Sequence, residues 1–302
     1  MNYSSAVTIV EVGPRDGLQN EATFVATPNK IEFIDLLSQS GLQYIEVTSF
    51  VSPKTIPQLA DNEAVFSGIS KPASLHYSAL VPNEKGMERA LSAGVKEIAI
   101  FTAASESFNQ RNINCSIAES ILRFAPVMVL AKEHKIRVRA YISCVLGCPY
   151  EGEITPNQVA KVTEELLALD VDEVSFGDTI GVGTPKQTKA LLSAVRTLMP
   201  LSNVTMHFHD TYGQAVANIY ASLECEISRF DSSVAGLGGC PYARGATGNV
   251  ATEDVLYLMH GLGIHTGVDI YKVVAAGDWI CKIMGRKNQS KVANALLANP
   301  CN

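Results

Sequence analysis

Long apolar runs are missing from this sequence. No stretch of the 302 residues approaches the roughly 18 to 20 uninterrupted apolar residues that a membrane span needs. The strand-like run "VTIVEV" begins at Val7, which leaves no room for a signal or transit peptide. We therefore expect no membrane partner and a location in the cytoplasm.

Cysteine is scarce and unpaired. The seven cysteines are an odd number, scattered without paired spacings, which disfavours a disulfide framework. Cys144 and Cys148 form a C-x3-C pattern without a second pair, a poor match to structural zinc sites, so we predict buried or loop thiols there. A chain of this kind is typical of the cytoplasm, with its thiols reduced.

Basic runs and linkers are absent as well. The net charge of -6 is spread along the chain, and no Lys/Arg run is long enough to bind nucleic acid, so we expect no such partner. No Pro/Ser-rich or low-complexity stretch marks a domain boundary. With 47% hydrophobic residues, the sequence predicts one domain over residues 1–302 with a large core.

Short β-branched runs alternate with longer helical patterns along the chain, which is typical of an α/β protein with a parallel sheet. Eight strands are predicted, the number that closes a barrel: Thr8–Val12, Tyr44–Thr48, Leu75–Val81, Glu97–Thr102, Arg137–Ser143, Glu173–Gly177, Val204–His209 and Phe230–Val234. We predict a (β/α)8 TIM barrel over about residues 7–260 and a helical C-terminal extension over about 261–298.

Helix starts support this alternation. In "TPNKIEFIDLLSQSG", Thr27 is a candidate cap and Pro28 takes the first helical position; "TPNQVAKVTEELLAL" and "TPKQTKALLSAVRTL" repeat the pattern. A doubly wound open sheet fits the same alternation, but its ligand would bind at a Gly-rich first turn. The first turn here is "GPRDG", and no segment matches G-x-G-x-x-G or a P-loop, which favours the barrel.

The segment "MHFHD" carries the clearest chemical signal. His207 and His209 lie two positions apart on a predicted strand and so share a face, while Met206 and Phe208 point to the other face. In a barrel the chemistry lies at the carboxyl ends of the strands, where Asp16 also falls. Two imidazoles and a carboxylate predict a site for a divalent ion, completed by an oxygen ligand and by substrate or water. The alternative is that both histidines are hydrogen-bonded barrel filling.

Other polar residues fall at the same strand ends. Asp178 and Asp210 are two of them, and Arg15 is a third, with a simple ion pair to its neighbour Asp16 as the alternative. Glu46 and Arg139 lie inside predicted strands and could brace the barrel interior, the reading we prefer for Arg139.

Cys240 lies in the predicted loop after the eighth strand. Five glycines between Gly236 and Gly248 permit close backbone approach to a ligand there. A thiol in such a loop can transfer a proton if its environment tunes its pKa. The alternative is a small apolar residue in a flexible loop.

Seven blocks of sequence resemble one known family in its order. They are "VGPRDGLQNE", "IEVTSFVSPK", "NINCSI", "SCVLGCPYEG", "GDTIGVGTP", "HFHDTYGQA" and "DSSVAGLGGCPYARGATGN". The similarity runs from about Val10 to Lys291, and the chain resembles the 3-hydroxy-3-methylglutaryl-CoA lyases, which are metal-dependent TIM barrels. The resemblance implies cleavage of (S)-3-hydroxy-3-methylglutaryl-CoA to acetoacetate and acetyl-CoA with Mg²⁺ or Mn²⁺.

The resemblance also assigns residues. The family's metal ligands fall on Asp16, His207, His209 and Asn249. Its catalytic arginine falls on Arg15, its loop cysteine on Cys240 and its active-site glutamate on Glu46. Cys240 would then protonate the enolate, and Asp16 and His207 are both candidates to accept the hydroxyl proton. An acyl-CoA substrate and a homo-oligomer, dimer or tetramer, are implied as partners.

Two rival interpretations differ in function. A Claisen-condensing enzyme resembling isopropylmalate or homocitrate synthase also carries H-x-H, but such chains usually add a regulatory C-terminal region, and "GGCPYARGATGN" favours the lyase. A catalytically silent acyl-CoA-binding barrel is the other. The combination of chemically active residues argues against it: Arg15, Asp16, His207, His209 and Cys240.

Overall fold

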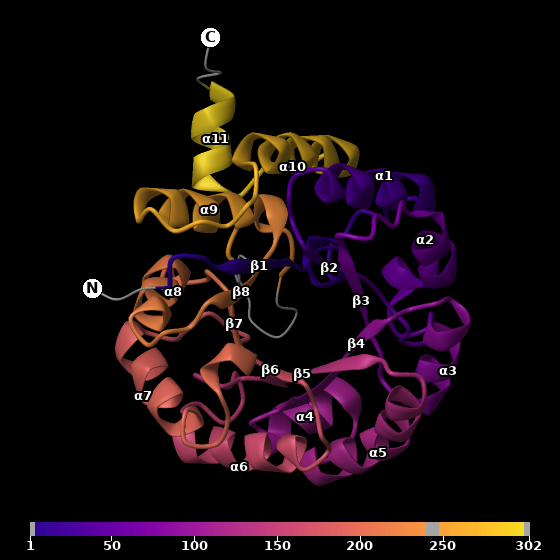
Figure 1. The fold of residues 1–302 in the computed structure, drawn as a ribbon, viewed down its shortest axis with the longest axis vertical. Helices are drawn as coiled ribbons and strands as arrows, with labels where there is room; N and C mark the ends of the chain where they lie inside the picture. The colour runs from indigo at the N-terminus through magenta and orange to yellow at the C-terminus, as the bar shows by residue number, and fades with distance from the viewer. Residues whose placement is uncertain (1–3, 240–247, 299–302) are drawn as a thin grey trace.

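A closed barrel of eight parallel strands forms the centre of the molecule (Figure 1). The computed structural model describes residues 4–239 and 248–298. The strands follow one another in sequence order, and β8 pairs with β1 to close the barrel. Their bounds are β1 Thr8–Glu11, β2 Tyr44–Ser49, β3 His76–Leu80, β4 Glu97–Ala103, β5 Arg137–Ser143, β6 Glu173–Asp178, β7 Val204–Phe208 and β8 Arg229–Ser232. The predicted barrel is confirmed.

Helices surround the barrel as an outer ring (Figure 1). The ring contains α1 Thr27–Ser38, α2 Asn62–Gly68, α3 Glu84–Ser92, α5 Ile117–Glu133, α6 Pro156–Leu167, α7 Pro185–Val195 and α8 Ala215–Leu223, and a further helix, α4 Glu106–Ile113, lies inside this ring in the view of Figure 1. Three helices, α9 Thr252–Gly261, α10 Ile270–Met284 and α11 Lys291–Ala298, lie together on the β1 side, and the last two form the predicted C-terminal extension. Short turns add η1 Gly13–Gly17, η2 Pro57–Leu59, η3 Leu201–Asn203 and η4 Val234–Gly236.

The three Thr-Pro pairs mark helix starts, but the threonine is not the N-cap residue in all three helices. The Thr155 hydroxyl accepts from the Gln158 amide at the start of α6, as an N-cap residue should. The prediction that Thr27 caps α1 is wrong, because the N-cap position is Ala26. The Thr27 hydroxyl instead donates to Asp61 Oδ2 at 2.7 Å, a tertiary partner that the local sequence does not reveal.

The strands divide the interior into two environments. Met206 and Phe208 on β7 belong to the apolar core between strands and helices, which confirms their predicted face. Inside the barrel, Arg139 on β5 is buried and pairs with Glu173 on β6 and Asp231 on β8. Buried charges need such partners because an unpaired ion in this environment costs several kcal/mol. Arg139 therefore braces the barrel interior, as expected.

Within residues 4–239 and 248–298, no single helix is long and apolar enough to cross a membrane. Helices α4 and α5 reach that length and composition only when taken together, and they meet at a bend of 55°. In α5 the apolar side chains of Ile121, Phe124 and Val127 are buried in the protein core.

The described cysteines are all free thiols: Cys115, Cys144, Cys148, Cys225 and Cys281. Cys144 and Cys148 are buried, which confirms the prediction of buried or loop thiols, and the Cys148 sulfur lies 3.0 Å from Ser105 Oγ. The remaining two cysteines, Cys240 and Cys301, lie outside the described residues.

Candidate active site

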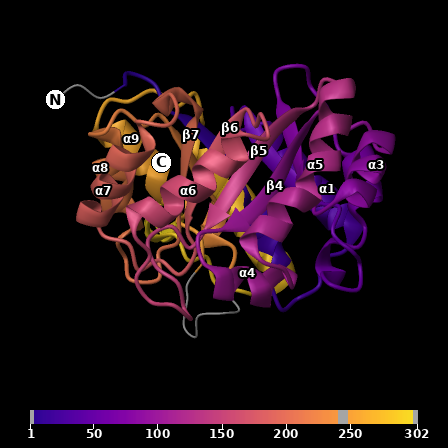
Figure 2. The same ribbon diagram turned by 90° about the horizontal axis from the view of Figure 1, so that it is seen from below.

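A cavity of about 320 Å³ opens where the strands end. Arg15 and Asp16, which follow β1, line it together with Tyr141 of β5, His207 of β7 and His209, which directly follows β7. Helix α4 lies at this end of the barrel and contributes Phe108 to the cavity wall (Figure 2). The carboxyl end of the strands is where barrel enzymes place their chemistry.

Three side chains in this cavity are placed as a ligand set. One potential ligand atom from each of Asp16, His207 and His209 lies within 4.8 Å of the other two. The π-helical turn η1 places Asp16 there: the backbone amides of three successive residues, Arg15, Asp16 and Gly17, all donate to the Val12 carbonyl. The sequence predicted this cluster from strand parity, and the structure brings the three groups together.

The electrostatics of the cluster fit a divalent metal ion. Burial and the neighbouring His207 lower the pKa of His209 to about 4, so its imidazole is neutral at pH 7. Burial raises the pKa of Asp16, but Arg15 and the two histidines outweigh it and the pKa falls to about 2. His209 Nδ1 is buried without a hydrogen-bond partner among the described residues. An ionised carboxylate beside imidazoles that can offer a lone pair suits a divalent cation.

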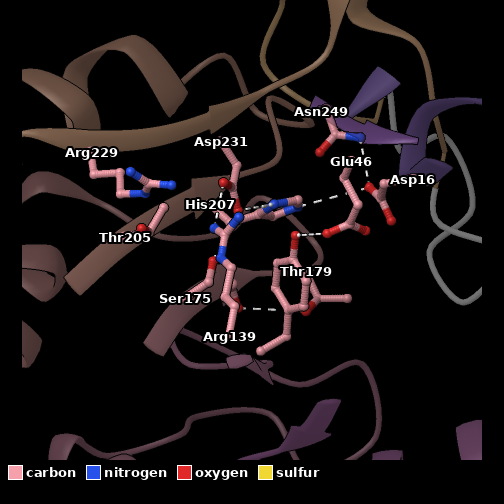
Figure 3. Close-up of polar contacts among 12 residues, drawn as sticks. Asp16, Glu46, Arg139, Ser175, Thr179, Thr205, His207, Arg229, Asp231 and Asn249 are labelled. Atoms are coloured by element: carbon pink, nitrogen blue, oxygen red, sulfur yellow. Dashed lines mark hydrogen bonds and ion pairs between the residues drawn. The ribbon is translucent and has the colours of Figure 1, made fainter. Parts of the chain in front are cut away.

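His207 lies between two carboxylates (Figure 3). Its Nδ1 is 3.1 Å from Asp231 Oδ2, and its Nε2 is 3.9 Å from Asp16 Oδ2. Asp231 is buried beneath the cavity and also accepts from Ser175 and Arg139. The imidazole is thus held at one nitrogen and presents the other to the ligand cluster.

Asn249, the fourth residue of the predicted ligand set, lies beside Asp16. Its Nδ2 donates to Asp16 Oδ2 at 2.8 Å and to the Leu237 carbonyl at 3.2 Å. Its backbone forms an isolated antiparallel bridge with His209. The residue is therefore adjacent to two of the other predicted ligands, and its own role as a ligand stays a prediction.

Arg15 is fixed beside the ligand cluster by acidic and aromatic partners. Its Nη1 lies 2.7 Å from Asp16 Oδ1, its Nε pairs with Glu46 Oε1, and its guanidinium carbon is 5.3 Å from the centre of the Tyr141 ring. Burial lowers the pKa of Arg15, but Glu46 and Asp16 more than offset this effect, so the side chain keeps its charge. Both the predicted ion pair to Asp16 and a cation facing the cavity are present.

Two strand-end carboxylates have structural positions outside the cluster. Asp178 is fully buried and accepts from the Gly183 amide at 2.9 Å, and burial raises its pKa to about 6. Asp210 accepts from the Ala215 amide at 3.0 Å at the start of α8. Cys240 lies outside the described residues.

Two site residues were not selected from the sequence. Asp231 of β8 contacts His207. Strand parity could have indicated it, because Asp231 lies two residues after Arg229 and so shares the inward face of β8 with that charged residue. Tyr141, two residues after Arg139 on β5, lies in the cavity wall and donates to Glu46 Oε2 at 2.7 Å.

The parallel (β/α)8 barrel carries an Asp-His-His cluster at the carboxyl ends of its strands, a donor set that suits a divalent metal ion. The HMGL-like family model matches residues 6–280. The chain belongs to the HMGL-like family.

Relatives of known name agree. The chain is 59% identical over 298 residues to a 3-hydroxy-3-isohexenylglutaryl-CoA/hydroxymethylglutaryl-CoA lyase of Pseudomonas aeruginosa, covering 99% of each chain. It is 56% identical over 289 residues to the human mitochondrial hydroxymethylglutaryl-CoA lyase, covering 96% of this chain and 89% of that one.

Solved structures are similar over the whole fold. The crystal structure of hydroxymethylglutaryl-CoA lyase from Pseudomonas aeruginosa matches with a TM-score of 0.97 at 59% identity and 99% coverage of both chains. An HMG-CoA lyase from Acinetobacter baumannii, in complex with coenzyme A and 3-methylmalate, matches with a TM-score of 0.93 at 36% identity, covering 98% of this chain and 96% of that one.

Proposed function

We propose that this chain is a lyase that cleaves (S)-3-hydroxy-3-methylglutaryl-CoA to acetoacetate and acetyl-CoA. The observation that carries the proposal is the meeting of the Asp16, His207 and His209 cluster with the buried cation Arg15 in one cavity. Retro-Claisen cleavage needs groups that bind the hydroxyl and carboxylate oxygens, an acceptor for the hydroxyl proton, and positive charge at the thioester enolate. The names of the relatives support the same reaction.

The ion proposed for the site is Mg²⁺ or Mn²⁺. Asp16, His207, His209 and Asn249 would hold it, a mixed oxygen and nitrogen set that suits such ions. When bound, the ion supplies Lewis-acid polarisation of substrate oxygens and lowers the pKa of the hydroxyl.

Arg15 is proposed to stabilise the enolate. As the bond between C2 and C3 of the substrate breaks, its electron pair moves into the thioester and C3 becomes the ketone carbon of acetoacetate. A guanidinium fixed in advance at the thioester oxygen favours this charge more than it favours the ground state. Glu46 and Tyr141 hold Arg15 in place: Glu46 accepts from both the Arg15 guanidinium and the Tyr141 hydroxyl.

Two groups can accept the hydroxyl proton, Asp16 and His207. Their side chains lie 3.9 Å apart, so a hydroxyl placed against one is close to the other. The low pKa of Asp16 makes its carboxylate a weak base, and the His207 imidazole contacts the Asp231 carboxylate through its other nitrogen. Both residues stay candidates for this step. In a later step the Cys240 thiol would donate a proton to the enolate carbon, which becomes the methyl group of acetyl-CoA.

A longer substrate is a second candidate for the same site. The Pseudomonas relative is named for 3-isohexenyl as well as 3-methyl substrates. One side of the barrel interior carries a small apolar cluster of Leu80, Ala99 and Tyr141, with Val51 and Phe101 packed against it, and four of these residues line the cavity. Such a wall favours an alkyl substituent larger than methyl.

We propose that the protein acts on an acyl-CoA, that it forms a homo-oligomer, dimer or tetramer, and that it is located in the cytoplasm. The relative solved with coenzyme A supports an acyl-CoA substrate, and a zebrafish relative is named as cytoplasmic.

One assay tests the proposed activity. Purified protein is given hydroxymethylglutaryl-CoA, and acetoacetate and acetyl-CoA are measured with and without a chelator. We expect both products in equal amounts, with formation stopped by the chelator. A Claisen-condensing enzyme would instead consume acetyl-CoA in the presence of a keto acid, and a silent binder would form no product from either mixture.

A further inference from the structure

The inward face of β8 carries a carboxylate directly beneath the predicted metal site. Asp231 is 1% exposed, and its two oxygens have separate partners. Oδ1 accepts from an Nη of Arg139, while Oδ2 accepts from Ser175 Oγ at 2.9 Å and lies 3.1 Å from His207 Nδ1 (Figure 3). The carboxylate is therefore oriented by Arg139 on one side and contacts the imidazole on the other.

This contact selects one form of the neutral imidazole. A carboxylate only accepts hydrogen bonds, so His207 must carry its proton on Nδ1 to satisfy Asp231 Oδ2. The lone pair is then left on Nε2, the nitrogen that lies 3.9 Å from Asp16. A carboxylate behind a ligating histidine fixes the ring orientation and raises the basicity of the ligand.

We propose that Asp231 is a positioning residue that holds His207 in the Nδ1–H tautomer and thereby sets the affinity of the site for its divalent ion. This inference rests on the proposed metal site. Asp231 does not touch the substrate, and it acts only through His207.

The substitution Asp231→Asn tests this directly. Arg139 needs an acceptor at the position of Oδ1, so the new amide places its oxygen there and its NH₂ group toward His207. An N–H donor facing His207 Nδ1 favours the opposite tautomer, with the proton on Nε2 and the lone pair turned away from Asp16. The volume of the side chain is unchanged.

Glu173→Gln is the matched control. Glu173 is also a buried carboxylate inside the barrel and also pairs with Arg139, at 3.0 Å. Its other partners among the described residues are Arg137, Arg229 and Thr205. Because this set does not include His207, Glu173→Gln removes a comparable buried charge without changing the imidazole's partner.

Two measurements are made on each purified, full-length protein. The first is ¹⁵N NMR of the histidine rings in the metal-free protein at about pH 9, where an ordinary imidazole is neutral. We expect the Nδ1–H tautomer at His207 in the unaltered protein and in Glu173→Gln, and the Nε2–H tautomer in Asp231→Asn. The second is Mn²⁺ binding followed by EPR. We expect Asp231→Asn to weaken binding by about 10- to 100-fold and Glu173→Gln to leave it within about 3-fold.

The outcomes separate this inference from the proposed function. An Nε2–H tautomer at His207 in the unaltered protein overturns the inference even if Asp231→Asn does not fold. Equal loss of Mn²⁺ affinity in both variants also overturns it, since a general effect of buried charge would then explain the loss. If the tautomers behave as expected but the unaltered protein binds no Mn²⁺, the positioning of His207 stands and the proposed metal site, with the affinity role of Asp231, fails.

Discussion

Tyr141 donates a 2.7 Å hydrogen bond to Glu46, and both side chains are buried in the barrel interior. The second oxygen of the same carboxylate pairs with Arg15 Nε. Glu46 therefore has both oxygens engaged, which suits a residue that orients Arg15 better than one that accepts a proton from substrate. Arg15 is consequently held with its charge at the edge of the ligand cluster.

The substitution Arg15→Lys tests the use of this geometry. Lysine keeps the charge but loses the planar fork that binds Glu46 and Asp16 at once. We expect turnover to fall by about 10² or more, the usual loss when one donor to a developing oxyanion is removed. Steady-state kinetics with hydroxymethylglutaryl-CoA measures the effect, and Mn²⁺ binding serves as the control for an intact site. Near-normal turnover would mean that Arg15 only forms ion pairs.

Removal of the ion should affect both activity and stability. Treatment with EDTA should abolish turnover, and addition of Mg²⁺ or Mn²⁺ should restore it. A ligand that binds only the folded chain also raises the melting temperature, so Tm should rise with Mn²⁺ concentration. His209→Ala should remove this rise in Tm, because it deletes one of the three clustered ligands. Full activity in protein shown to be free of metal would mean that the two histidines only fill the barrel interior as hydrogen-bonded side chains.

The sequence predicts much of this site because the barrel brings strand ends together whatever their separation in the chain. Strand parity placed His207 and His209 on one face, and the topology then placed Asp16 within reach of them. Asp231 could not be assigned in the same way. Its contact with His207 depends on the register in which β7 and β8 pair, where these two residues are direct partners. Register in a parallel sheet is set by packing of the whole barrel, which local sequence patterns do not encode.

The wrong cap at Thr27 has a similar cause. The residue type is suited to an N-cap, but the partner of its hydroxyl, Asp61, is 34 positions away. A long-range hydrogen bond of this kind competes with the local one, and the helix begins one residue earlier than the Thr-Pro pattern predicts. The role of Cys240, in contrast, stays a prediction from the sequence and the family resemblance, since the residue lies outside the described residues.

Two buried acids should make stability depend on pH near neutrality. Burial raises the pKa of Glu253 to about 8 and that of Glu11 to about 7, although both accept backbone hydrogen bonds. Their ordinary value is 4.5, so the folded state binds more protons than the unfolded state between pH 4.5 and about 8. Their contribution to stability is complete below pH 4.5 and is lost as the pH rises through 7 and 8.

Glu253→Gln tests this sign. The amide imitates the protonated acid and does not titrate, so its free energy of unfolding should fall less between pH 6 and 8.5 than that of the unaltered protein. The difference in slope should approach about 1.4 kcal/mol per pH unit for one proton. His209, whose pKa is lowered to about 4, has the opposite effect below pH 6.5, but it contributes equally to both proteins and cancels in the comparison. Urea denaturation at several pH values measures the slopes, and equal slopes would show that Glu253 is ionised in the folded protein.

Cys240→Ser separates a chemical role of this thiol from a structural one. Serine is nearly isosteric with cysteine but far less acidic, so folding, metal content and substrate binding should be almost unchanged. Turnover should fall by roughly 10² to 10⁴, the usual contribution of a positioned acid or base. Alkylation of the free enzyme should also inactivate it, and a bound substrate analogue should protect.

Cys225→Ser is the matched control. Cys225 is a partly exposed thiol in the connection between α8 and β8, at the amino end of β8, whereas the ligand cluster lies at the carboxyl ends of the strands. That variant should turn over normally and remain sensitive to alkylation. If Cys240→Ser turns over like the unaltered enzyme with the same metal content, the thiol is a loop residue and the enolate takes its proton from another group.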